Sequence, residues 1–154
     1  MAAEIERKFL VTNDSWRDMA RASMNITQAY ISHRPDGIVR LRLTDSKAWL
    51  TVKGRTRGIS RNEWEYEIPI EDAREMIVHH IYEGSYLSKT RYLVDYKGRT
   101  WEIDEFHKGL KGLVLAEVEL PSVETEVELP PFIGEEVSGN PEYYNSNLMK
   151  KLTS

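Results

Sequence analysis

The chain has 154 residues, no cysteine, and 25 acidic against 21 basic residues, for a formal net charge of -4. This length predicts one domain over residues 1–154; the missing cysteines exclude disulfides and thiolate metal sites, and the balanced charge gives no basic field that would attract nucleic acid. Because the first residues lack a signal-peptide pattern and no segment reaches membrane-spanning length, we expect a cytoplasmic protein with no membrane partner.

Residues 4–9 predict a first strand with one charged face. The alternation places on that face Glu4, Glu6 and Lys8, and on the other Ile5, Arg7 and Phe9. Unpaired charges cost several kcal/mol each when they lose water, about 2 to 7 kcal/mol even for a neutral polar group. The charged face therefore needs a metal, a counter-charge or water.

The next elements run to residue 61. We expect a short helix at 16–21, strands at 26–31, 39–43 and 48–53, and a turn at 34–37. Residues 54–61 form a polar loop that contains Arg55, Arg57 and Arg61. These arginines either steer phosphate toward an entrance or form a solvated charge run without a role.

The second half of the chain continues the pattern. We expect strands at 63–68, 87–94, 100–106 and 115–120, and a helix over about 71–83. A short acidic helix is predicted from 121–122 to the prolines at 130–131, and the tail 140–152 predicts a loop followed by a last short helix.

Whole strands sort their charges by sign, which indicates more than a solvated sheet face. Like charges two residues apart on one strand face repel, so we expect a group of opposite charge between them. An α+β fold satisfies this if eight antiparallel strands close into a barrel, a tunnel with a charged interior covered outside by three or four helices. The acids would suit Mg2+ or Mn2+. The basic wall would bind a polyphosphate through Lys8, Arg40, Arg42, Lys53, Lys89 and Arg91.

These residues also resemble a known family. Glu4-Ile5-Glu6-Arg7-Lys8 is similar to the Glu-x-Glu-x-Lys signature of the CYTH superfamily, also called triphosphate tunnel metalloenzymes. The rest of the family pattern follows in order as Arg40-Leu41-Arg42, Thr51-Val52-Lys53, Glu65-Tyr66-Glu67, Lys89-Thr90-Arg91-Tyr92, Glu102-Ile103-Asp104, Glu117-Val118-Glu119 and Tyr144-Asn145. The resemblance covers nearly the whole chain and is strongest to the bacterial inorganic tripolyphosphatases.

The resemblance implies a site and an activity. It implies metal ligation by Glu4, Glu6, Glu117 and Glu119, with Glu102 and Asp104 as further ligands. It also implies that Tyr30, working with Lys8 or Lys89, orients or deprotonates the water that attacks a terminal phosphoryl group. Glu65 and Glu67 are expected to support the metal ligands without binding the metal themselves. The substrate would be a small-molecule triphosphate, tripolyphosphate first and ATP second.

Three alternatives remain open at this point. A class IV adenylate cyclase would use the same walls to release pyrophosphate from ATP, but no residues here identify an adenine site. A thiamine triphosphatase belongs to the same family. A sensor that only binds polyphosphate or nucleotide is disfavoured by the carboxylates, because a polyanion-binding site alone would favour cations throughout.

Overall fold

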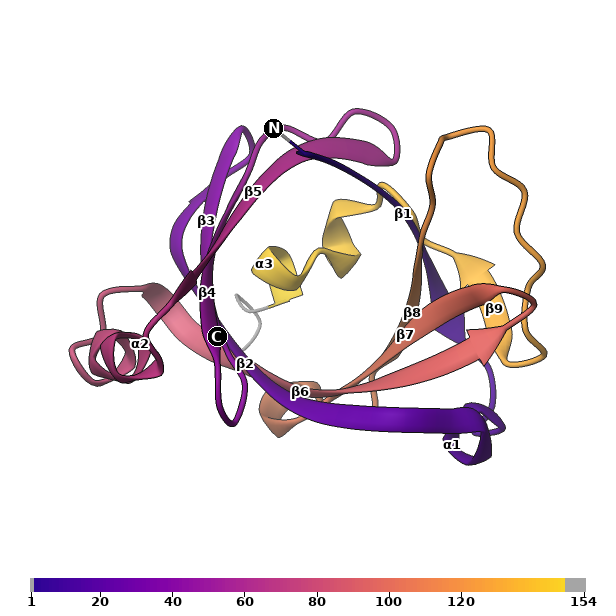
Figure 1. The fold of residues 1–154 in the computed structure, drawn as a ribbon, viewed down its shortest axis with the longest axis horizontal. Helices are drawn as coiled ribbons and strands as arrows, with labels where there is room; N and C mark the ends of the chain where they lie inside the picture. The colour runs from indigo at the N-terminus through magenta and orange to yellow at the C-terminus, as the bar shows by residue number, and fades with distance from the viewer. Residues whose placement is uncertain (1, 149–154) are drawn as a thin grey trace.

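The computed structural model describes residues 2–148, and these form a closed antiparallel barrel (Figure 1). Its eight strands are β1 (Ala2–Val11), β2 (Ala20–Arg34), β3 (Gly37–Leu43), β4 (Ala48–Lys53), β5 (Ser60–Ile68), β6 (Glu83–Tyr96), β7 (Arg99–Phe106) and β8 (Val114–Glu119). The order around the ring is β5-β4-β3-β2-β6-β7-β8-β1, and pairing of β1 with β5 closes it. The predicted barrel is therefore confirmed, although β2 and β6 are much longer than expected.

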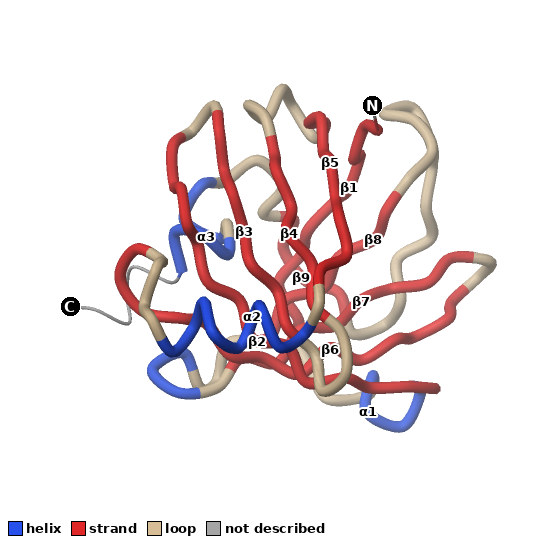
Figure 2. The backbone as a smooth tube through the Cα atoms, turned by 60° about the vertical axis from the view of Figure 1, so that its left-hand side comes forward, coloured by secondary structure: helices blue, strands red, loops and turns tan. Residues whose placement is uncertain are grey.

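The outside of the barrel carries the apolar faces. One buried cluster gathers Phe9, Trp16, Trp101 and Val118 under helix α1 (Trp16–Met19). Helix α2 (Ile70–Val78) crosses the outer face of β3 and β4 (Figure 2) and buries Ala73 against Leu41. Both helices are shorter than predicted: α1 gives way to β2 at Ala20, and α2 ends before Ile81. None of the helices in residues 2–148 is long and apolar enough to cross a membrane.

The segment after β8 corrects one expectation. Residues 121–132 are not helical; they form a strap that leads into a ninth strand, β9 (Ile133–Glu136), which pairs with β1 outside the ring. Glutamates alternate along the strap with Val123, Thr125, Val127 and Leu129, and this period of two with β-branched residues disfavours a helix. Gly134 permits the close approach to β1, because a Cβ there would lie 3.3 Å from the Leu10 carbonyl oxygen and 2.6 Å from Cγ2 of Thr12, the residue after the strand.

The C-terminal segment enters the barrel instead of covering its outside. It contains two short turns of helix, η2 (Pro141–Tyr143) and α3 (Asn145–Leu148), and α3 lies within the ring of strands in Figure 1. Leu148 packs with Leu87, Phe106, Leu110 and Leu115 in an apolar cluster at the end of the barrel where β1 finishes. The tunnel is thus filled at this end, which we call the floor; residues 149–152 of the predicted tail helix lie outside the described residues.

Candidate active site

The register of the barrel brings the predicted acids onto neighbouring strands. Glu6 on β1 pairs with Glu119 on β8, and Glu117 on β8 pairs with Lys8 on one side and with Glu102 of β7 on the other. Like charges directly opposite each other on one sheet face are destabilising. This acidic wall, on β7, β8 and β1, therefore calls for a cation.

The facing wall is basic. Tyr30 on β2 pairs with Arg40 on β3, and Gln28 pairs with Arg42, whose Nε and Nη2 donate to Gln28 Oε1 at 2.9 and 2.7 Å. Burial, together with Arg40 and Arg91, lowers the pKa of Arg42 to about 9, so this guanidinium remains charged at neutral pH. Mutually repelling arginines of this kind favour an anionic ligand.

A cavity of about 180 Å³, the central cavity, separates the two walls. Almost every side chain around it is charged, and no apolar residue lines it. The lining consists of Glu4, Glu6, Arg40, Arg42, Lys53, Glu63, Glu65, Arg91, Glu102, Glu117, Glu119 and Asn145. Acids on one side and bases on the other fit a polyanion that carries cations.

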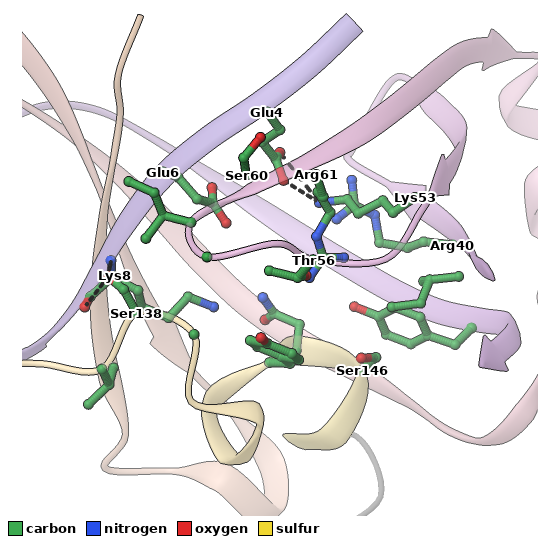
Figure 3. Close-up of a pocket in the computed structure, with 18 residues that line it drawn as sticks. Glu4, Glu6, Lys8, Arg40, Lys53, Thr56, Ser60, Arg61, Ser138 and Ser146 are labelled. Carbon is green, nitrogen blue, oxygen red and sulfur yellow. Dashed lines mark hydrogen bonds and ion pairs between the residues drawn. The ribbon is translucent and has the colours of Figure 1, made fainter. Parts of the chain in front are cut away.

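A smaller cavity of about 70 Å³, the floor cavity, has its lining drawn in Figure 3, where the C-terminal turns of helix lie along one side. The two share Glu4, Glu6, Arg40, Lys53 and Asn145, so they are adjoining parts of one interior. Lys8 and Tyr30 line the floor cavity, and its remaining walls come from residues 56–61 and 137–146. The predicted catalytic lysine and tyrosine thus lie toward the closed end of the barrel.

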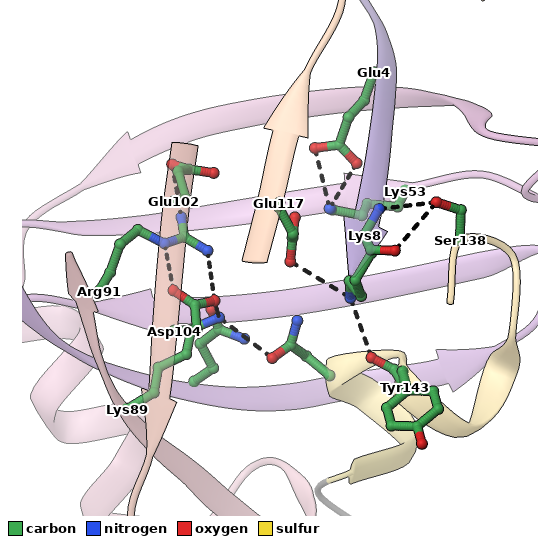
Figure 4. A network of polar contacts seen from close by, with 12 residues as sticks. Glu4, Lys8, Lys53, Lys89, Arg91, Glu102, Asp104, Glu117, Ser138 and Tyr143 are labelled. Atoms are coloured by element: carbon green, nitrogen blue, oxygen red, sulfur yellow. Dashed lines mark hydrogen bonds and ion pairs between the residues drawn. The ribbon is translucent and has the colours of Figure 1, made fainter. Parts of the chain in front are cut away.

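Ion pairs inside the barrel hold several of these side chains (Figure 4). Lys8 Nζ lies 3.4 Å from Glu117 Oε1 and 3.1 Å from the Tyr143 carbonyl oxygen, to which it donates. Lys53 Nζ lies 3.1 Å from Glu4 Oε1 and 3.2 Å from Glu63 Oε2. No three acidic or histidine side chains in residues 2–148 converge as a ready cation site, and Lys8 and Lys53 engage the carboxylates of Glu117, Glu4 and Glu63.

The raised pKa values of two carboxyl groups in the central cavity indicate that this cavity suits a cation. Burial and the neighbouring carboxylates of Glu117 and Glu4 raise the pKa of Glu6 well above its usual range. Burial and a hydrogen bond shared with Glu4 raise the pKa of Glu63 to about 7. Buried carboxyl groups held this close are stabilised either by shared protons or by a hard cation with oxygen ligands. The donor set therefore fits a divalent metal.

Lys89 and Asp104 lie behind the cavity wall and line neither cavity. Asp104 accepts hydrogen bonds from Lys89 Nζ at 2.7 Å and from Arg91 Nε at 2.8 Å, and Asn145 Oδ1 accepts a further one from Lys89 at 3.2 Å. This buried network fixes Arg91, whose guanidinium reaches the central cavity.

The structure sorts the remaining predicted residues. Glu65 lines the central cavity and accepts a hydrogen bond from Thr51 Oγ1 at 2.9 Å. Glu67 is exposed and lines neither cavity. Sequence reasoning missed Glu63, which pairs across the strands with Lys53, and gave Asn145 no role. The shared face of Glu63 and Glu65 was a signal for the first, and the Tyr144-Asn145 pair of the family pattern was a signal for the second.

The chain is similar to known proteins over nearly its whole length. A CYTH domain family model matches residues 2–151. The chain is 45% identical over 150 residues to an inorganic triphosphatase of Acetivibrio thermocellus, covering 97% of this chain and 95% of the relative. It is 36% identical over 151 residues to an inorganic triphosphatase of Nitrosomonas europaea, covering 94% and 95%.

Solved structures show the same fold. A crystal structure of an inorganic triphosphatase superposes with a TM-score of 0.70 at 30% identity, covering 100% of this chain and 97% of the other. A Hippeastrum protein, described as a putative adenylyl cyclase with a dominant triphosphatase activity, gives a TM-score of 0.59 at 17% identity over 77% and 80% of the two chains. Likeness at that lower identity concerns the fold alone.

Proposed function

Because the chain belongs to the CYTH domain family, we propose that it is an inorganic triphosphatase, a phosphoanhydride hydrolase that acts on tripolyphosphate. The observation that carries this proposal is the central cavity, whose acidic and basic walls face each other with no apolar residue between them. A nucleoside would find no apolar surface there to bind its base. Inorganic tripolyphosphate therefore suits the cavity better than ATP, which is a second substrate to test.

When substrate binds, the lysines of the cavity would leave their carboxylate partners and bind phosphate oxygens instead. Arg40, Arg42, Lys53 and Arg91 line it and would bind phosphate oxygens. Phosphate would draw Lys8 and Lys53 away from Glu117 and Glu4, and these carboxylates would then be free to hold a cation. The proposed ligands of Mg2+ or Mn2+ are Glu4, Glu6, Glu102, Glu117 and Glu119. A bound divalent ion supplies neutralisation of charge on the phosphoryl oxygens and activation of water.

The residues of the floor cavity would act on the terminal phosphoryl group. Burial raises the pKa of Tyr30, although Arg40, Arg42 and Lys8 oppose this, so its hydroxyl keeps its proton at neutral pH. Gln28 Nε2 donates to the Tyr30 hydroxyl oxygen at 3.1 Å, which leaves the hydroxyl proton for a phosphate oxygen or water. Lys8 would neutralise charge beside it. Tyr30 then orients the reactants as a hydrogen-bond donor and is not the base.

Asp104, Lys89 and Glu65 would support this arrangement from behind. Since Asp104 lines neither cavity, we propose that it fixes the positions of Lys89 and Arg91. Lys89 would in turn help to balance the negative charge of Asp104. Glu65 holds Thr51 and lies 3.7 Å from Arg40 Nη2, so it would orient that arginine. The absence of cysteine fits catalysis in a reducing compartment such as the cytoplasm.

The test is phosphate release from tripolyphosphate, ATP and thiamine triphosphate in parallel, with Mg2+, with Mn2+ and with chelator. Metal-dependent orthophosphate release with tripolyphosphate preferred is the expected result. Cyclic AMP with pyrophosphate would instead make the protein an adenylate cyclase. Tight binding of every triphosphate without turnover would make it a sensor and end the catalytic assignments.

A further inference from the structure

Arg61 is set apart from the other two arginines of its segment. Arg55 and Arg57 are exposed, whereas Arg61 is partly buried on β5, directly opposite Glu4 of β1. Its side chain lines the floor cavity, where Figure 3 shows it beside Lys53. A single polar loop in the sequence thus contains two solvated arginines and one that faces the interior.

The charge of Arg61 is not balanced by a carboxylate. The other cations of the floor cavity each have an acidic neighbour: Glu117 for Lys8, Glu4 and Glu63 for Lys53, and Glu65 for Arg40. For Arg61, no carboxylate within residues 2–148 lies at ion-pair distance, and the contact the guanidinium makes is with the ring of Tyr144, 5.5 Å from Cζ to the ring centroid.

The contact with Tyr144 leaves the guanidinium able to bind an anion. A guanidinium stacked on an aromatic face keeps its N–H donors at its edge, where they match the oxygens of a phosphoryl group. Tyr144 comes from the C-terminal segment that closes the barrel, so the stacked pair joins β5 to the floor. The same segment holds Lys8 through the Tyr143 carbonyl.

We propose that Arg61 is a phosphate-binding residue of the floor cavity: it binds the terminal phosphoryl group of the substrate beside Lys8 and Tyr30, and Tyr144 positions it. This inference rests on the proposed triphosphatase function and extends the basic wall by a residue outside the predicted set. Because the floor cavity adjoins one end of the central cavity, Arg61 contacts a third phosphoryl group that a shorter polyphosphate does not place there. Arg61 is thereby a determinant of chain-length specificity.

The test is calorimetric binding of diimidotriphosphate, a hydrolysis-resistant analogue of tripolyphosphate, and of pyrophosphate, both with Mg2+. For Arg61→Ala we expect a Kd for diimidotriphosphate raised about tenfold, or about 1.4 kcal/mol, and a Kd for pyrophosphate changed less than about twofold. Arg55→Ala, a charge-matched control at an exposed position, leaves both constants unchanged. Thermal melts of each variant report folding, and Arg61→Gln replaces Arg61→Ala if the latter does not fold.

Two variants of the stacking partner complete the test. Tyr144→Phe keeps the ring and should bind diimidotriphosphate as the wild type does, whereas Tyr144→Leu should weaken it in the same direction as Arg61→Ala. Unchanged analogue binding in Arg61→Ala, or equal weakening for both ligands, overturns the inference and leaves the triphosphatase function standing. Failure of the wild-type protein to bind the analogue would instead remove the proposed function, and the role of Arg61 with it.

Discussion

Lys89 Nζ lies 2.7 Å from Asp104 Oδ2, and the two side chains are 0% and 2% exposed. Arg91 Nε approaches the other oxygen of Asp104 at 2.8 Å. Burial alone would raise the pKa of Asp104, but Arg91 and Lys89 hold it well below its usual range. Asp104 is therefore the counter-charge of buried Arg91 and of Lys89, whose own pKa burial and the nearby arginines lower to about 7. Its loss would leave Arg91 insufficiently paired and would favour the neutral form of Lys89.

Asp104→Ala should lower the free energy of unfolding by about 3 to 5 kcal/mol, the usual cost of removing one partner of a buried ion pair. Urea denaturation of the metal-free protein measures this. The control is Asp95→Ala, whose pair with Arg21 is 56% and 52% exposed, and which should leave the urea midpoint close to that of the wild type. Equal losses in the two variants would contradict a structural role for Asp104.

Tyr30→Phe separates hydrogen bonding from proton abstraction. Since burial raises the pKa of Tyr30, the variant should lower kcat about tenfold, the effect of one lost hydrogen bond, and leave the pH profile near neutrality unchanged. The measurement is steady-state tripolyphosphate hydrolysis across pH, with Tyr66→Phe, at a 60% exposed position, as control. If the rate of Tyr30→Phe no longer changed with pH near neutrality where the wild-type rate does, this tyrosine would be the general base after all.

The strand alternation was sufficient to predict the barrel and its charged interior, because period two assigns each side chain to a face. It does not fix how far along the barrel each side chain sits. Glu63, Glu65 and Glu67 share one face, yet β1 pairs with β5 only as far as Glu63; Glu63 and Glu65 line the central cavity, and Glu67, farthest along the strand, does not. Register between distant strands decided this, and single-strand patterns carry no such information.

The sequence did not predict that the C-terminal segment closes one end of the barrel. Leu148 and Asn145 are close in sequence, yet one joins the apolar cluster with Leu87 and the other accepts a hydrogen bond from Lys89. Four residues of helix hold too little pattern to reveal which surface they cover. The helix predicted at 121–132 was wrong for another reason. The glutamates there suggested a helix, but Val127 and Phe132 pack against the buried cluster of Phe9 and Trp101 outside the barrel, and these contacts hold the segment extended.

Glu65 and Glu67 give a matched pair of substitutions on one strand. Glu65→Gln removes the charge that lies 3.7 Å from Arg40 Nη2, on a side chain that is itself 40% exposed, and should lower kcat/KM for tripolyphosphate by about fivefold, the upper end for a partly exposed ion pair. Glu67→Gln makes the same chemical change at a position that lines neither cavity and should stay within about twofold of wild type. Initial rates at saturating Mg2+ compare them. Equal activity of both variants would remove Glu65 from the supporting set, and a loss in Glu67→Gln would bring that residue back.

Metal binding should depend on pH through Glu63. Its pKa of about 7 in the folded protein, against an ordinary 4.5, means that the folded state keeps a proton between these values that the unfolded chain releases. The stability that this proton gives the metal-free protein is therefore present at low pH and lost as pH rises toward about 7. Glu63 shares this proton in a hydrogen bond with Glu4, a proposed metal ligand, so a divalent cation competes with the proton. The affinity for the cation should therefore increase with pH and level off above about 7.

Titration of the protein with Mn2+ by calorimetry, in two buffers of different ionisation heat, counts the protons released. We expect release at pH 6 and much less at pH 8, with an affinity up to about tenfold lower per pH unit below 7 for each proton displaced. Glu6, whose pKa is also raised, adds to the release. Glu63→Gln should reduce the proton count at pH 6, while the exposed Glu67→Gln should not. Mn2+ binding without proton release at pH 6 would mean that the cation is held elsewhere than on this acidic wall.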